Sequence, residues 1–236
     1  ARASLMSTIA FLNPTILKQL DLPIPNRDTT PQLLDALDLS QQIEPNNALV
    51  AYRKLYALNL LECEHWQGFV ETDLFRLHVQ VFQPKEEKIK GTICLLHGYL
   101  EHSGIYQPII KEILEQGFSV ITYDLPGHGL SNGSPASIQN FEHYQQVLHA
   151  VYDAVRGASQ LPKPWLGIGQ STGGAIWMHH LLEFAERRED PIVDRVLLLS
   201  PLIRPAKSAW WHNSVGLGII RRIKTQVPRH FRRNNH

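Results

Sequence analysis

Between residues 92 and 200, apolar segments alternate with stretches of helical periodicity. The apolar segments are TICLLH (92–97), FSVITY (118–123), WLGIG (165–169) and VDRVLLLS (193–200). The first predicted helix has an apolar stripe at Ile105, Ile109 and Ile113 and stops at Gly117. The second ends at Gly157, and its stripe is Phe141, Tyr144, Leu148, Val151 and Val155. A third helix runs to about Arg187. Apolar strands between amphipathic helices are typical of a parallel sheet covered on both faces. The pattern therefore predicts an α/β fold that binds ligands at the carboxyl ends of its strands.

The N-terminal part of the chain follows other patterns. Residues 1–33 carry four prolines among short apolar patches, which predicts an irregular arm. Residues 46–62 have helical spacing and are predicted to form a helix that packs on the sheet. The apolar side of this helix is Leu49, Tyr52, Tyr56 and Leu60.

A strand is predicted between these regions. Apolar and polar residues alternate from Phe75 to Val81, which indicates a half-buried strand. The segment WQGFVE (66–71) is its predicted hairpin partner, with the turn at Thr72-Asp73.

Composition excludes several classes of protein. The 236 residues are 43% apolar, which excludes a disordered chain, and no apolar run approaches the roughly 20 residues that cross a bilayer. The two cysteines, Cys63 and Cys94, exclude a disulfide scaffold and a four-cysteine zinc site. Because Cys94 lies inside an apolar run, we expect a buried thiol there.

Charge is distributed unevenly along the chain. The net charge is +1, but residues 201–236 hold eight basic residues and no acidic one, which leaves a net charge of −7 on residues 1–200. This asymmetry indicates that the last segment has a different role. The chain begins with Ala rather than Met, which suggests a processed product or a fragment, and its first stretch is weak as a signal peptide.

The most informative motif is Gly-Gln-Ser-Thr-Gly at residues 169–173, between an apolar strand and a predicted helix. A sharp strand-to-helix turn needs glycine on both sides, because a Cβ there would collide with neighbouring backbone. Such a turn lifts the serine hydroxyl clear of the sheet, above the N-terminus of the helix. We interpret Ser171 as a nucleophile; the alternative is a plain glycine-rich turn.

An acyl-transfer serine needs hydrogen-bond donors aimed at the developing oxyanion. The backbone N–H of Thr172, directly after the serine, is one predicted donor. The second is predicted in the loop after the first parallel strand, where Gly98 lets the backbone approach closely and Tyr99 offers its N–H.

Three polar residues of the neighbouring loops invite a catalytic interpretation. His97 precedes the serine and lies at a strand end, so we expect it to be hydrogen-bonded inside its loop. Asp124 is expected to cap its loop by accepting backbone N–H bonds rather than to act as a catalytic acid. His128, between two glycines, is expected to fix the same loop.

The segments HGYLEHSGIY, YDLPGHGLSNG and GQSTGG, in this order and spacing, resemble the α/β-hydrolase superfamily. The branch they resemble is the monoacylglycerol lipase and lysophospholipase group, also called serine aminopeptidase S33-like. The resemblance covers residues 66–205 and implies Ser171 as nucleophile, with the N–H groups of Tyr99 and Thr172 as oxyanion hole. Residues 1–60 have no counterpart in it.

The resemblance implies hydrolysis of a carboxylic ester through an acyl-enzyme, without a cofactor. The implied substrates are monoacylglycerol, lysophospholipid or a similar acyl ester. The label S33 also admits a peptidase, but no pocket for an N-terminal amine is evident. Epoxide and haloalkane hydrolases are disfavoured, because they need Asp where this chain has Ser171.

A catalytic acid and histidine are expected after the serine in this fold. The later acidic residues are Glu183, Glu186, Glu189, Asp190 and Asp194. The first three belong to the helix after the serine, and the other two precede the next strand, at the opposite edge of the sheet from Ser171. None is predicted to be the catalytic acid, and the remaining histidines (His212, His230 and His236) lie in a basic, non-periodic stretch.

We therefore expect the chain to lack the C-terminal strand–helix blocks of the family. The predicted organisation is an N-terminal arm and helix (1–62), the N-terminal part of the hydrolase core (63–205) and the start of a basic cap region (206–236). Truncation is the favoured explanation, with a degenerate hydrolase or a triad completed by another chain as alternatives. The alternative function is lipid or partner binding without turnover, and little or no labelling by a serine-directed probe is expected for this chain alone.

The tail combines tryptophans with clustered arginines. Residues 208–233 could contact anionic lipid, although a cap helix over the pocket is the favoured interpretation. No nucleic-acid partner is expected, because no recognised fold accompanies the basic cluster. No metal site is predicted, since the adjacent His179 and His180 point apart on a helix. A cytoplasmic location is expected, with peripheral membrane contact as the alternative.

Overall fold

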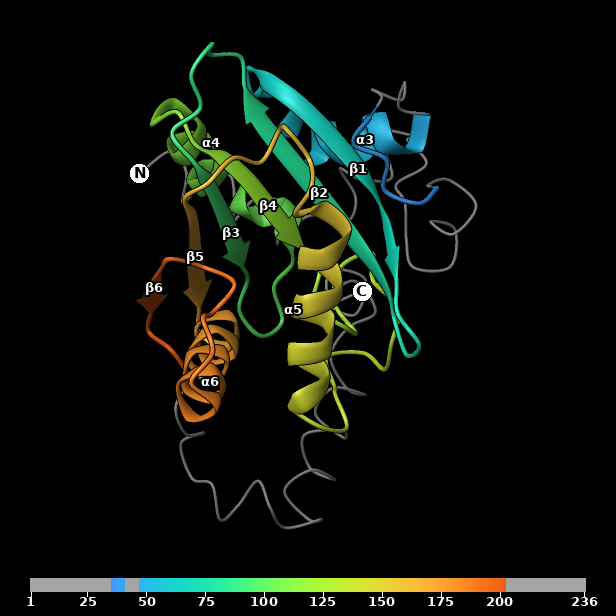
Figure 1. Cartoon of the computed structure of the whole chain (residues 1–236). Helices are drawn as coiled ribbons and strands as arrows, with labels where there is room; N and C mark the ends of the chain where they lie inside the picture. The colour runs from blue at the N-terminus through green and yellow to red at the C-terminus, as the bar shows by residue number, and fades with distance from the viewer. Residues whose placement is uncertain (1–34, 41–46, 203–236) are drawn as a thin grey trace.

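The computed structural model describes residues 35–40 and 47–202, and in this part of the chain six strands form one sheet (Figure 1). The strands are β1 (Cys63–Glu71), β2 (Arg76–Pro84), β3 (Thr92–Leu96), β4 (Ser119–Tyr123), β5 (Trp165–Gln170) and β6 (Arg195–Leu199). Their order across the sheet is β1-β2-β4-β3-β5-β6. Strands β3 to β6 are parallel, whereas β2 is antiparallel to both β1 and β4. The predicted parallel strands and the N-terminal hairpin are confirmed.

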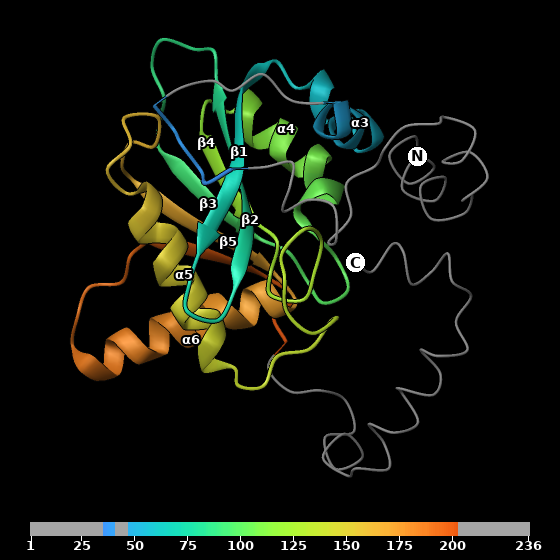
Figure 2. The same ribbon diagram turned by 90° about the vertical axis from the view of Figure 1, so that its right-hand side faces the viewer.

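Helices cover both faces of this sheet (Figure 2). They are α3 (Asn47–Leu55), η2 (Leu58–Leu60), η3 (Ser103–Tyr106), α4 (Gln107–Glu115), α5 (Glu142–Val155) and α6 (Thr172–Arg187). Side chains of a strand alternate between faces. Cys94 and Leu96 of β3 accordingly pack with α5 and α6, while Ile93 and Leu95 pack with α3 and α4. The chain therefore has the α/β-hydrolase fold that was predicted, with a mostly parallel sheet between two layers of helices.

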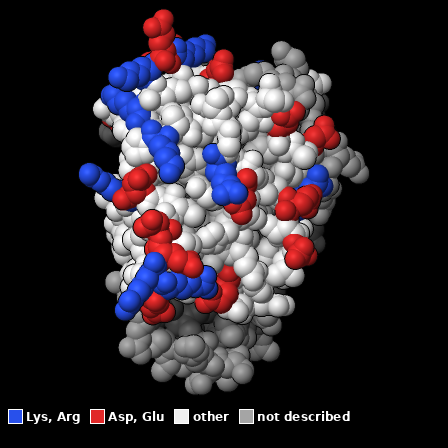
Figure 3. Space-filling view, in the orientation of Figure 1, with Lys and Arg blue, Asp and Glu red and all other residues white. Residues whose placement is uncertain are grey.

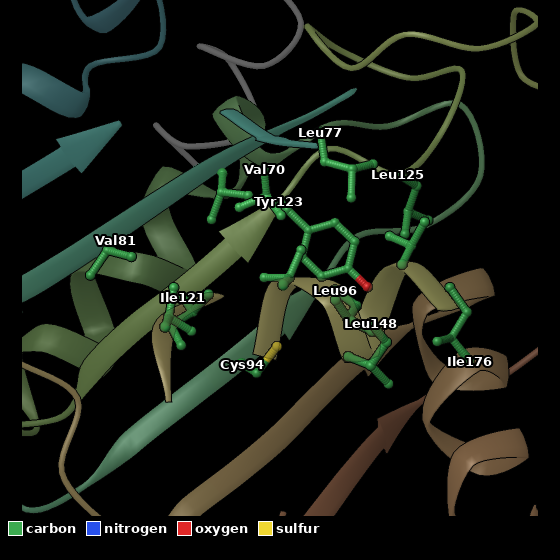
Figure 4. Packing of buried hydrophobic residues seen from close by; sticks show 14 of the residues in the cluster. Val70, Leu77, Val81, Cys94, Leu96, Ile121, Tyr123, Leu125, Leu148 and Ile176 are labelled. Atoms are coloured by element: carbon green, nitrogen blue, oxygen red, sulfur yellow. The ribbon is translucent and has the colours of Figure 1, made fainter. Parts of the chain in front are cut away.

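Tyr123 of β4 lies in the largest apolar cluster of the described residues (Figure 4). Its ring is fully buried among Leu77 of β2, Leu96 of β3 and Leu148 of α5. Burying one such large side chain contributes about 1.5–3 kcal/mol. Through this cluster α5 packs on the sheet. On the surface of the same face, acidic and basic side chains lie next to one another (Figure 3).

The predicted apolar stripe of α4 is wrong in part. Ile105 and Ile109 are 37% and 38% exposed, and the buried side chains at helical spacing are instead Tyr106, Ile110, Ile113 and Leu114. Residues 103–106 form a 3-10 turn before the α-helix, and Ile110 packs in the same apolar cluster as Tyr106. The predicted stop at Gly117 is confirmed, because its φ of 79° ends the helix in the left-handed region.

The predicted helix over 46–62 is shorter than expected. α3 ends at Leu55, and Ala57 takes a left-handed φ of 56° before the short η2 turn. Leu60 therefore points outward and is 67% exposed, whereas Leu58 is buried in its place. Tyr52 is buried against the sheet, which confirms the predicted packing of this helix.

The prediction that β2 is half-buried is wrong. Its polar residues His78 and Gln80 are as fully buried as Val79 and Val81. Segments that are distant in sequence cover the polar side of the strand, since Gln80 donates to the Ser103 hydroxyl at 2.8 Å. Buried polar side chains are stable only when they are hydrogen-bonded, so this strand forms part of an internal polar network.

The predicted arm (1–33) lies outside the described residues, as do the predicted cap region (206–236) and the predicted membrane-contact segment (208–233). Among the described helices, none is both long enough and apolar enough to cross a membrane.

Candidate active site

Ser171 occupies the turn between β5, which ends at Gln170, and α6, which begins at Thr172. Its backbone has φ 49° and ψ −106°, a conformation that residues with a Cβ rarely adopt. Such strain persists only where the surrounding structure enforces it, and it is frequent at functional sites. The predicted strand–serine–helix arrangement is present.

Two glycines make this turn sterically possible. A Cβ on Gly169 would lie 2.4 Å from the carbonyl carbon of Gly173, and a Cβ on Gly173 would lie 2.4 Å from the carbonyl oxygen of Leu96. Real Cβ atoms essentially never make non-bonded contacts shorter than 3.0 Å. The close passage of α6 over β5 and β3 therefore requires glycine at both positions of the motif.

Backbone hydrogen bonds hold Ser171 from two sides. Its N–H donates to the carbonyl of Leu199 at 2.9 Å, and its own carbonyl accepts from Leu202 at 2.9 Å and from Ala175 at 3.0 Å. The end of β6 and the first turn of α6 thus fix the strained residue. The side chain is partly exposed, and its hydroxyl makes no hydrogen bond with any residue that the structure describes.

The loop after β3 is tied to this turn through a cluster of side chains. The N–H of Gly98 donates to Oε2 of Glu101 at 2.8 Å, and the hydroxyl of Tyr106 donates to the same oxygen at 2.5 Å. The Tyr106 oxygen also lies 3.0 Å from Oε1 of Gln170. A Cβ on Gly98 would lie 2.2 Å from that amide oxygen, so glycine allows the close approach.

Sequence reasoning assigned no role to Glu101, Tyr106 or Gln170, although all three belong to the quoted motif segments. Their spacing in the sequence gave no sign that they meet. Burial raises the pKa of Tyr106, and the hydrogen bond to Glu101 raises it further. The phenol therefore stays protonated at neutral pH and can donate a hydrogen bond.

The predicted oxyanion donors leave the sheet at the same edge. β3 and β5 are adjacent parallel strands with Leu96 opposite Gly169 in register, so Tyr99 and Thr172 both follow the carboxyl ends of these strands. Thr172 is 5% exposed, and Tyr99 donates its hydroxyl to the carbonyl of Ala136 at 3.0 Å. The assignment of their N–H groups to an oxyanion hole stays a prediction, as does that of Ser171 to the nucleophile.

His97 is buried and hydrogen-bonded at both ring nitrogens, as expected for a structural histidine. Nδ1 lies 2.8 Å from the carbonyl of Gly98, and Nε2 accepts from the N–H of Leu125 at 2.8 Å. Burial, together with the nearby ring of His128, lowers the pKa of His97 to about 3. The neutral ring therefore joins two loops, and Nδ1 of His128 binds its own loop at the carbonyl of Pro126, 2.9 Å away.

Asp124 caps its loop, which confirms the prediction. One oxygen accepts from the N–H of Ser103 at 2.7 Å and from the Ser103 hydroxyl at 2.6 Å; the other accepts from Leu130 at 2.8 Å and lies 3.0 Å from Nδ1 of His78. Burial raises the pKa of Asp124, but the hydrogen bond from His78 and the adjacent histidines outweigh it and hold the pKa well below its usual range. The fully buried carboxylate is therefore ionised and structural.

The acidic residues after the serine lie as expected, except that Glu189 falls beyond α6, which ends at Arg187. Asp194 accepts from the N–H of Trp165 at 2.8 Å, at the start of β5 and so at the opposite end of the strand from Ser171. Glu183 lies on α6, three turns beyond the serine.

One group of metal-ligating side chains is present in the described ranges, and it consists of Glu142, His179 and Glu183. His179 is eight residues beyond Ser171, about 12 Å along α6. The group is therefore separate from the strand-to-helix turn.

Residues 87–233, more than half of the chain, match the family model described as serine aminopeptidase, S33. Among curated proteins, the chain is 26% identical over 119 residues to the phospholipase YtpA of Bacillus subtilis, covering 50% of this chain and 43% of the relative. It is 30% identical over 112 residues to caffeoylshikimate esterase of Arabidopsis thaliana (47% and 34%). It is 31% identical over 115 residues to a monoglyceride lipase homolog of monkeypox virus (48% and 39%). The chain thus spans less than half the length of these relatives.

Proposed function

The chain belongs to the serine aminopeptidase S33 family of α/β-hydrolases, and on this premise we propose that the protein hydrolyses carboxylic esters with Ser171 as its nucleophile. The observation that carries the proposal is the strained backbone of Ser171 between β5 and α6. No other non-glycine residue with positive φ among those described stands at a strand-to-helix turn between two sterically required glycines. The names of the relatives, a phospholipase, an esterase and a lipase homolog, share ester hydrolysis.

In the proposed reaction the Ser171 oxygen attacks the carbonyl carbon of the ester and its proton passes to a general base. The N–H groups of Thr172 and Tyr99 stabilise the oxyanion of the tetrahedral intermediate. Collapse of the intermediate breaks the bond to the alcohol, which leaves with the proton, and water then hydrolyses the acyl-enzyme by the same steps in reverse order. None of the hydrogen bonds of the described residues joins a base to the Ser171 hydroxyl, so we place the histidine and its acid outside the described part of the chain.

We propose a lipid acyl ester, such as monoacylglycerol or lysophospholipid, as the substrate class. Two of the three relatives are named as enzymes of glycerolipids or as homologs of such enzymes. The third is named for an ester of an aromatic acid, which supplies the competing substrate class for the test.

The proposal is tested with the native protein, as produced from its own gene, on monooleoylglycerol, lysophosphatidylcholine and a caffeoyl ester. Loss of the nucleophile should lower kcat by about a thousandfold or more in Ser171→Ala. Ser159→Ala, at an exposed serine, is the matched control and should keep wild-type turnover. Turnover that survives in Ser171→Ala would overturn the nucleophile, and turnover of the caffeoyl ester alone would overturn the lipid class. Binding of monooleoylglycerol without turnover would support the non-catalytic alternative.

A further inference from the structure

Three side chains from two helices converge on the face of the molecule that α5 and α6 cover. Glu142 is the first residue of α5, and His179 and Glu183 lie one turn apart on α6. One ligand atom from each residue lies within 4.8 Å of the other two. Because Glu142 belongs to another helix, the sequence spacing alone gave no sign of the group.

The neighbouring histidine takes no part in this group. His180 is fully buried, its Nε2 accepts from the N–H of Ile192 at 3.2 Å, and its ring contacts that of Phe184. This confirms the prediction that His179 and His180 point apart. His179 is instead a partly exposed side chain whose two ring nitrogens face different carboxylates.

The hydrogen bonds around His179 leave two ligand atoms facing each other. Nε2 of His179 lies 3.2 Å from Oε1 of Glu142, whereas Nδ1 lies 3.9 Å from Oε2 of Glu183. Nδ1 and this Oε2 are both buried atoms without a hydrogen-bond partner, while the other oxygen of Glu183 binds Arg187. If Nε2–H donates to Glu142, Nδ1 carries a lone pair, so neither atom can donate to the other. Buried polar atoms without a hydrogen-bond partner are few in native proteins, and an ion that is not part of the structure is one explanation for them.

We propose that Nδ1 of His179 and Oε2 of Glu183 bind a divalent transition-metal cation of the zinc class, with Glu142 holding the imidazole through Nε2–H. Zinc binds histidine nitrogen at about 2.0–2.1 Å and carboxylate oxygen at about 2.0–2.2 Å, so a nitrogen and an oxygen ligand of one ion lie at most about 4.3 Å apart. The gap of 3.9 Å is within this limit. A carboxylate on the far nitrogen of a metal-bound histidine is the usual outer partner that fixes the ring.

The chemistry of the ligands selects the class of cation. Imidazole nitrogen suits zinc and similar transition metals, whereas magnesium and calcium prefer oxygen ligands alone. Water completes the coordination, because two protein atoms leave positions open. The ion would connect the first residue of α5 to the middle of α6, and this role does not depend on whether Ser171 is a nucleophile.

The site is tested by calorimetric titration of the full chain with zinc chloride, and separately with magnesium chloride. Zinc binding should weaken at least tenfold in His179→Gln and in Glu183→Gln, and 10- to 100-fold in Glu142→Gln, where only the orienting carboxylate is lost. Magnesium should not bind at this group. His149→Gln is the matched control and should bind zinc like the wild type, because His149 lies two turns along α5 from Glu142 and its ring contacts those of His180 and Phe184.

Histidines outside the described residues could bind zinc independently. Their contribution to zinc binding is removed in a tail variant, in which His212, His230 and His236 are all changed to glutamine. The tail variant should keep the zinc binding that His179→Gln removes. Zinc should also raise the midpoint of thermal unfolding of this variant, and the rise should disappear on adding His179→Gln. The proposal is overturned if His179→Gln and Glu183→Gln bind zinc as tightly as the wild type, or if the tail variant binds none.

Discussion

The hydroxyl oxygen of Tyr106 lies 3.0 Å from Oε1 of Gln170, the residue directly before Ser171. The same hydroxyl donates to Glu101, whose carboxylate also holds the N–H of Gly98. One phenol therefore connects the loop after β3 with the strand-to-helix turn after β5. The two proposed oxyanion donors lie on these two segments, which this connection joins.

Removing the Tyr106 hydroxyl should loosen this connection. Tyr106→Phe should lower the unfolding free energy by about 1–2 kcal/mol, because Glu101 loses a hydrogen bond. It should also lower kcat of the proposed ester hydrolysis about tenfold with little change in KM, since a misplaced donor acts mainly on the transition state. Tyr152→Phe, whose hydroxyl makes no hydrogen bond with a described residue, is the control. An unchanged kcat in Tyr106→Phe, measured against this control, would show that the connection does not position the donors.

A methyl group on Gly173 should disrupt the turn. The added Cβ would lie 2.4 Å from the Leu96 carbonyl oxygen, so Gly173→Ala should cost about 1–3 kcal/mol of unfolding free energy. Gly157→Ala adds the same methyl where no atom lies within 4 Å and should be neutral or slightly stabilising. Urea denaturation followed by circular dichroism measures both variants, and equal effects would contradict the steric argument.

The buried Asp124 carboxylate should be a major contributor to stability. Asp124→Asn replaces an ionised acceptor of four hydrogen bonds with a neutral amide and should cost about 3 kcal/mol or more. Asp153→Asn removes an exposed partner of Arg156 and should change the unfolding free energy by less than about 0.5 kcal/mol. Similar urea midpoints for the two variants would show that the buried network is dispensable.

Stability should fall as the pH is lowered from about 6.5 toward 4. Burial lowers the pKa of His97 to about 3 and that of His180 to about 4, whereas in the unfolded chain both titrate near 6.5. The unfolded state therefore binds more protons within this window, and the unfolding free energy decreases as the pH falls. The depressed pKa of Asp124 adds its own loss only below about pH 4.

Urea midpoints between pH 7.5 and 4.5 measure this dependence. His97→Gln should show a shallower decrease than the wild type, because one of the histidines with a lowered pKa is removed; His65 and His102 also have lowered pKa values because of burial. A midpoint that stays constant or rises on acidification would contradict the account of these buried neutral histidines.

Local patterns were sufficient to predict the strands, the hairpin and the position of Ser171. Each apolar run is long enough to identify one strand, and the glycines on either side of Ser171 identify the sharp turn because their steric requirement is local. The face of α4 was harder to predict, since Ile109 and Ile110 are adjacent and both are apolar. The packing of the helix on the sheet decides which of them is buried.

Contacts between distant segments were beyond local patterns. The alternation of β2 predicts an exposed His78, but the side chain is buried and lies 3.0 Å from Asp124, which follows another strand. The group of Glu101, Tyr106 and Gln170 and the group of Glu142 and His179 likewise join separate elements. Periodicity shows which side of an element is apolar, but not which polar partner another segment brings.

Labelling of the native protein with a fluorophosphonate probe tests the central claim, that Ser171 is a nucleophile. Trypsin should release residues 157–187 as one peptide, because Pro164 blocks cleavage after Lys163, and fragment ions then distinguish Ser159 from Ser171. The account predicts an adduct on Ser171 that is absent from Ser171→Ala. An adduct on another residue, or no adduct on native protein that hydrolyses esters, would contradict it.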